Sequence, residues 1–159
     1  MSTKGRYFAM FSLLSILILS ACIKQDDGFE YERVFVSFSQ KGGQVPSDQY
    51  FSEYALNGTA ITYSRAYANG TVSYFRTGNV SADDARRVGK YVVDAGIFGM
   101  ASKLTLGADG SERPSATLQV SIDGRNKTVT MSPYMEEYAP GNVQKLVFEL
   151  KALAQGLQS

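Results

Sequence analysis

TLQVSIDGRNKTVTM, residues 117–131, is the clearest strand pair in this 159-residue sequence and decides its fold class. Apolar residues alternate with polar ones on both sides of Asp123-Gly124: Leu118, Val120 and Ile122 before it, Val129 and Met131 after it. Because successive side chains of a strand point to opposite faces, this pattern gives one buried face. We predict a hairpin packed on a hydrophobic core.

A second hairpin is predicted earlier in the chain. Ala60–Tyr67 and Thr71–Thr77 are rich in β-branched and aromatic residues and flank Asn69-Gly70, a preferred turn. Its tyrosines, Tyr63, Tyr67 and Tyr74, form a possible binding face for sugar or peptide. The favoured interpretation is structural, because cross-strand aromatic pairs stabilise a sheet without any ligand.

The remaining elements are one strand and two helices. Val34, Val36 and Phe38 alternate with their neighbours as in a strand, whereas residues 44–56 carry no clear pattern and are left unassigned. Ser81-Ala82-Asp83-Asp84 begins a helix that stops at Gly96, and its acids are interpreted as capping residues rather than a catalytic pair. A final amphipathic helix follows Pro140.

These elements predict an α+β domain over residues 32–159. We expect a largely antiparallel sheet made of two hairpins and an N-terminal strand, in the order β-β-β-α-β-β-α. Both amphipathic helices are expected to pack on one face of that sheet.

The amino terminus has the three parts of a signal peptide. Lys4 and Arg6 precede an uncharged stretch from Tyr7 to Leu19, and Ser20-Ala21 lead to the only cysteine of the chain, Cys22. An uncleaved transmembrane anchor is the alternative. Its apolar run, from Tyr7 to Ile23, lies at the lower edge of the roughly 17 to 25 residues that cross a bilayer.

Leu19-Ser20-Ala21-Cys22 resembles the lipobox of bacterial lipoproteins. The resemblance implies cleavage after residue 21, a lipid on Cys22 and a membrane-anchored protein of the cell envelope, with residues 22–31 as lipidated end and tether. In lipoproteins of Gram-negative bacteria, an aspartate directly after the lipidated cysteine commonly retains the protein at the inner membrane. Position 23 is Ile, so the resemblance favours the periplasmic side of the outer membrane if the organism is Gram-negative.

Composition argues against most enzyme and nucleic-acid functions. The chain has no histidine, which removes the commonest general base and metal ligand, and its one cysteine is assigned to lipid. We therefore expect no enzyme activity, no cofactor and no metal. The 16 basic and 15 acidic residues show no basic cluster, so no nucleic-acid partner is expected.

Part of the chain resembles a group of small secreted bacterial domains that includes emfourin, an inhibitor of thermolysin-like metalloproteases. The matching pieces are Ser81–Ala95, Gly96-Ile97-Phe98, Leu118–Arg125, Val129 and Pro140–Leu153. The resemblance implies a fold and supplies no inhibitory contact residue. Two functions are expected: a non-catalytic binding or structural lipoprotein with an envelope protein or glycan partner, or a metalloprotease inhibitor.

Overall fold

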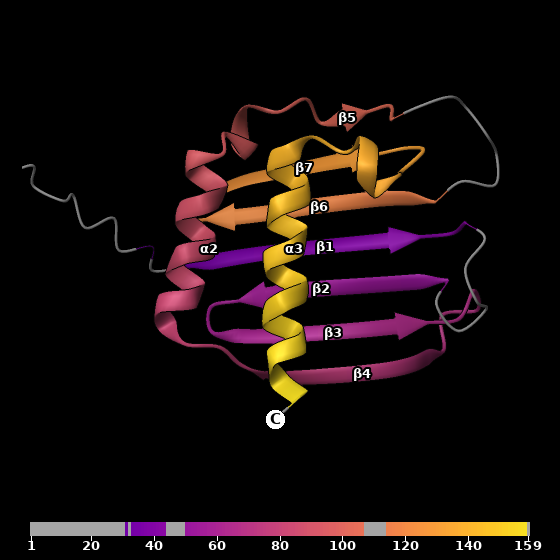
Figure 1. The fold of residues 1–159 in the computed structure, drawn as a ribbon, viewed down its shortest axis with the longest axis horizontal. Helices are drawn as coiled ribbons and strands as arrows, with labels where there is room; N and C mark the ends of the chain where they lie inside the picture. Colours follow the sequence, from indigo (N-terminus) through magenta and orange to yellow (C-terminus); the bar gives the residue numbers. More distant parts are fainter. Residues whose placement is uncertain (1–30, 32, 44–49, 107–113, 159) are drawn as a thin grey trace, which may run out of the picture. The chain divides into compact units, whose positions relative to one another are not determined.

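The computed structural model describes residues 31, 33–43, 50–106 and 114–158, which belong to one compact unit, Tyr31–Ser159. These residues form an α+β structure with a seven-stranded, mostly antiparallel sheet and two α-helices (Figure 1). The strands are β1 (Val34–Lys41), β2 (Phe51–Asn57), β3 (Ala60–Ala66), β4 (Val72–Asn79), β5 (Lys103–Leu104), β6 (Ser115–Ile122) and β7 (Arg125–Met131). The helices are α2 (Ala82–Asp94) and α3 (Gly141–Gln155), with short 3-10 turns η2 (Ile97–Gly99), η3 (Glu136–Tyr138) and η4 (Gly156–Gln158).

The sheet has the strand order β4-β3-β2-β1-β6-β7-β5. β1 lies between β2 and β6 and pairs antiparallel with both, so the N-terminal strand joins the two predicted hairpins into one sheet. β5 is parallel to β7, and the other pairings are antiparallel.

The expected element order, β-β-β-α-β-β-α, is wrong in two places. Among the described residues, four strands precede α2, because Phe51–Asn57, which overlaps the unassigned segment 44–56, forms β2. Three described strands lie between the helices, because Lys103–Leu104 adds β5 to the edge beside β7. A strand of two residues is too short to show an alternating pattern, so β5 could not be predicted from the sequence.

The predicted hairpin turns are present. Asp123 and Gly124 have φ angles of 49° and 85° between β6 and β7, as a type I′ turn requires. Gly70 has a φ of 84° in the loop between β3 and β4, where the Asn69 side chain accepts a hydrogen bond from Thr71 N at 2.9 Å. Both turns fix the register of the strands that they join.

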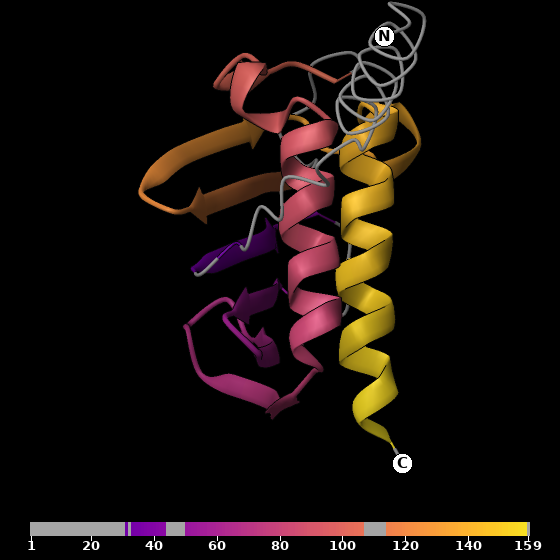
Figure 2. The same cartoon turned by 90° about the vertical axis from the view of Figure 1, so that its left-hand side faces the viewer.

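α2 and α3 lie side by side on one face of the sheet, and no helix of the described residues lies on the opposite face, which we call the helix-free face (Figures 1 and 2). The core fills the space between the two layers. Its fully buried members include Val36 of β1, Leu56 of β2, Ile61 of β3, Leu118 of β6, Val92 of α2, and Leu146 and Leu150 of α3. Since residues two apart on a strand share a face, these positions identify the helix side of β1, β2, β3 and β6.

α2 approaches β1 closely at Gly89. A β-carbon at this position would lie 2.8 Å from Val34 Cγ2 and 3.3 Å from Tyr31 Cδ2. Because Gly89 has no side chain, the backbone of α2 can pack directly against β1, the middle strand of the sheet.

The segment 1–30, with the predicted signal peptide and Cys22, lies outside the described residues, as do 44–49 and 107–113. Among the helices in the described part of the chain, none has the length and apolar character needed to span a membrane.

The close approach at Gly89 predicts the effect of a single methyl group. Gly89→Ala should lower the free energy of unfolding by about 1 kcal/mol, because an overpacking cost of about 1–3 kcal/mol exceeds a helix-propensity gain of about 1 kcal/mol. The control is Gly141→Ala in α3, where a β-carbon meets nothing within 4 Å and stability should be unchanged or slightly raised. Urea unfolding measures both. A Gly89→Ala protein as stable as the parent would contradict this packing.

Candidate functional site

Strand register places three rows of side chains across β2, β3 and β4 on the helix side of the sheet. The first row is Leu56, Ile61 and Gly78; the second is Tyr54, Tyr63 and Arg76; the third is Ser52, Arg65 and Tyr74. α3 and η4 cover the first row. Leu56 and Ile61 are 0% exposed, and the Leu157 side chain lies over Gly78, leaving no room for a β-carbon there. The second and third rows are half-buried.

The tyrosines of these rows contact one another across the strands. The rings of Tyr54 and Tyr63 are stacked, with centroids 4.5 Å apart and planes 12° from parallel. Tyr74 is tilted against Tyr63, with centroids 5.6 Å apart. Burial, followed by the neighbouring Tyr63, raises the pKa of Tyr54 far above its ordinary value. Like any tyrosine at neutral pH, Tyr54 keeps its proton and can donate a hydrogen bond.

Two arginines lie among the tyrosines. The Arg65 guanidinium is 4.8 Å from the centroid of the Tyr74 ring and 5.8 Å from that of Tyr63, and Arg76 is 5.9 Å from that of Tyr74. These are cation–π distances. Within the described part of the chain, neither arginine forms an ion pair, and the buried Nε of Arg65 has no hydrogen-bond partner.

A pocket of about 160 Å³ opens between these rows and the last turn of α3. Its lining residues are Tyr54, Tyr63, Tyr74, Arg76, Ala154 and Gln155, and we call it the tyrosine pocket. Glu136 is the acidic residue whose charge raises the pKa of Tyr54, and it forms an ion pair with Lys151 Nζ at 2.8 Å. The side chains at the pocket are therefore polar, aromatic and positively charged.

The structure brings together two of the three tyrosines predicted as a binding face. Tyr63 and Tyr74 line the tyrosine pocket. Tyr67 does not, because it follows the last residue of β3 and its side chain is exposed. Its backbone N–H donates to Thr71 O and its carbonyl accepts from Gly70 N, so this residue closes the loop.

Tyr54 and the two arginines were not predicted as part of a site. Tyr54 belongs to the segment left unassigned, although Asn57-Gly58 before Ala60 is a hairpin-turn signal of the same kind as Asn69-Gly70. Gly58 has a φ of 58° in the tight connection between β2 and β3. The two-residue turn Gly58-Thr59 pairs Asn57 with Ala60 and so places Tyr54 opposite Tyr63.

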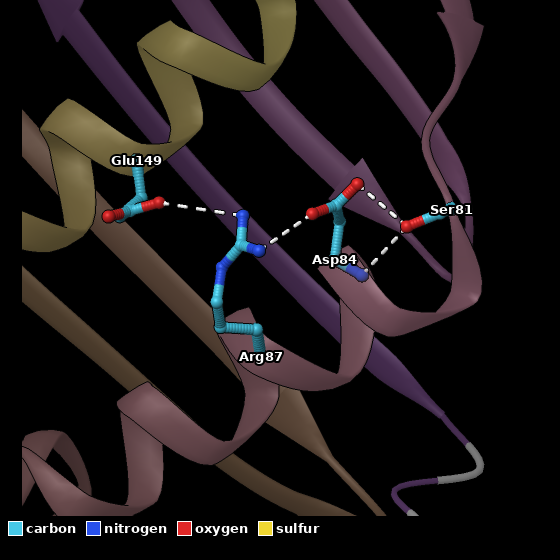
Figure 3. Close-up of polar contacts among 4 residues, drawn as sticks. All are labelled: Ser81, Asp84, Arg87 and Glu149. Carbon is cyan, nitrogen blue, oxygen red and sulfur yellow. Dashed lines mark hydrogen bonds and ion pairs between the residues drawn. The ribbon is translucent and has the colours of Figure 1, made fainter.

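The acidic pair Asp83-Asp84 caps α2, as predicted. Ser81 Oγ accepts a hydrogen bond from Asp84 N at 3.0 Å and donates one to Asp84 Oδ2 at 2.7 Å (Figure 3). This hydroxyl, assisted by the Arg87 charge, lowers the pKa of Asp84. Asp83 pairs with Arg86 at 3.1 Å. Both carboxylates therefore have structural partners at the start of the helix.

The same cluster links the two helices. Arg87 contacts Asp84 at 2.8 Å and reaches Glu149 of α3 at 3.9 Å (Figure 3). Arg87 and Glu149 also line a pocket of about 120 Å³ between α2 and α3. Because its arginine already has two carboxylate partners, this second pocket offers less to a charged ligand than the tyrosine pocket does.

Among the described residues, no group of three or more His, Cys, Asp or Glu side chains could hold a metal ion. No protein family model matches the chain, and comparison with curated proteins gives no significant match. The likeness to emfourin therefore stays a prediction, and the tyrosine pocket is the candidate site on geometric grounds alone.

Proposed function

We propose that this protein is a lipid-anchored, non-catalytic binding protein of the cell envelope, and that it holds its ligand in the tyrosine pocket. The observation that carries the proposal is the pair of half-buried arginines stacked on tyrosines beside an open pocket. Such a site presents aromatic surface and convergent polar groups, the usual combination in a ligand pocket.

Binding rather than catalysis is favoured by the chemistry of the lining. Tyrosine, arginine, glutamine and alanine line the pocket. General acid–base catalysis works best with a group whose pKa lies near the operating pH, and the pKa of Tyr54 is shifted away from neutrality. These side chains recognise and orient a ligand.

The anchor is supported by sequence. The basic residues Lys4 and Arg6, the apolar stretch after them and the small residues before Cys22 together indicate processing and acylation at Cys22. More than one acyl chain is needed for lasting attachment, because a single chain gives only marginal membrane binding. In a Gram-negative organism, the proposed location is the periplasmic side of the outer membrane.

The anchoring proposal predicts a lipid on one residue. Mass spectrometry of the protein extracted from its native membrane should give an N-terminal peptide that begins at Cys22 and carries acyl groups. A Cys22→Ser variant should leave the membrane fraction, because it lacks the thiol that accepts the lipid. An unmodified Cys22, or a Cys22→Ser variant that still partitions with membranes, would refute the anchor.

The binding proposal predicts where a ligand touches the protein. A photo-crosslinking amino acid at Gln155, an exposed residue that lines the pocket, should form adducts in intact cells. The matched control is Gln119 of β6, also exposed but on the helix-free face of the sheet. Mass spectrometry of the recovered protein measures adducts at both positions.

Adducts at 155 that disappear when Tyr63→Ala is added are the expected result. Adducts at 119 with none at 155 would show that the helix-free face is the binding surface, and the tyrosine pocket would lose its proposed role.

A further inference from the structure

We infer that the ligand of the tyrosine pocket is an acidic sugar residue, a six-membered ring that carries a carboxylate. This inference rests on the proposed function, since it names the class of ligand for the same pocket. Charge, volume and lining chemistry each support it.

The positive charge at the pocket favours an anionic ligand. Arg76 lines the pocket, and Arg65 lies beside it against the Tyr74 ring. Both are half-buried, and no carboxylate of the described residues forms an ion pair with either one. Charged groups withdrawn from water are normally paired. A carboxylate on the ligand would complete the pairing, and arginine binds carboxylates through two parallel hydrogen bonds.

Neighbouring groups prepare the arginines for that role. Stacking on Tyr74 holds both guanidinium groups, at 4.8 Å for Arg65 and 5.9 Å for Arg76. Glu136 forms an ion pair with Lys151 at 2.8 Å, so its carboxylate is not the partner of either arginine. Side chains fixed before binding lose less entropy when the ligand arrives.

The volume of the pocket limits the ligand to about one ring. The pocket measures about 160 Å³. A protein cavity of about 150 Å³ accommodates benzene, a single six-membered ring. A larger group, such as a nucleotide, would therefore extend out of the pocket.

The lining favours a hydroxylated ring. Three phenol groups, from Tyr54, Tyr63 and Tyr74, and the amide of Gln155 provide donors and acceptors around the space, beside the aromatic surface of the rings. A sugar ring has C–H groups for the aromatic surface and hydroxyls for the phenols and the amide. A purely apolar ring would make no hydrogen bonds with these groups, whereas a hydroxylated ring can.

Titration of the detergent-solubilised protein with D-glucuronate tests the inference, with D-glucose as the neutral analogue. Isothermal calorimetry should show saturable binding of glucuronate and at least tenfold weaker binding of glucose. Arg76→Gln and Arg65→Gln, which remove the charge, should each weaken glucuronate binding about tenfold or more. The control is Arg125→Gln: Arg125 is also stacked on an aromatic ring, 4.2 Å from the centroid of Phe98, but belongs to β7, and its loss should leave binding unchanged.

Circular dichroism of each variant separates loss of binding from loss of fold. If Arg76→Gln does not fold, Tyr74→Phe, which removes only a hydroxyl, should still weaken glucuronate binding. Equal affinity for glucose and glucuronate, or unchanged affinity in the folded arginine variants, would overturn the inference. Adducts at position 155 in cells without glucuronate binding would leave the proposed function standing and exclude an acidic sugar.

Discussion

The candidate site depends on where α3 meets the sheet. Its buried stripe, which includes Leu146, Leu150 and Ala154, packs over the core, and Leu157 in the following turn lies on Gly78 of β4. A β-carbon at position 78 would lie 2.5 Å from Leu157 Cδ2, so any larger residue there would displace the Leu157 side chain. The end of the helix is thereby fixed one row away from Tyr63 and Arg76, covering the first row of side chains and leaving the next two open.

The position of the end of α3 explains why aromatic and basic residues occupy the second and third rows. A side chain beside the end of a helix is partly shielded from water, so it needs an apolar body and a polar or charged tip. Tyrosine and arginine meet this requirement, and stacking between them offsets part of the lost hydration. At the contact between α2 and α3, an arginine charge is instead balanced by carboxylates, because Arg87 is paired with Asp84 and Glu149. Among the described arginines, Arg65 and Arg76 are the half-buried ones, and neither forms an ion pair there; this combination distinguishes the surroundings of the tyrosine pocket.

Local patterns predicted much of the fold, and long-range arrangement accounts for what they missed. Alternation and turn dipeptides located β6, β7 and the β3–β4 hairpin, and Ser81 located the start of α2. They could not show that β1 lies in the middle of the sheet, because strand order is decided by contacts between distant segments. The site was predicted only in part, because some of its residues come together through contacts between distant segments. Tyr63 and Tyr74 face each other within one hairpin, whereas Tyr54 and the end of α3 reach them only through the tertiary fold.

The most direct test of the account is a crystal structure of the protein grown with D-glucuronate at a concentration that saturates binding in solution. The account predicts one sugar ring in the tyrosine pocket, with its carboxylate within hydrogen-bond distance of the Arg76 guanidinium. A pocket without sugar under those conditions, or a sugar bound only on the helix-free face of the sheet, would contradict it.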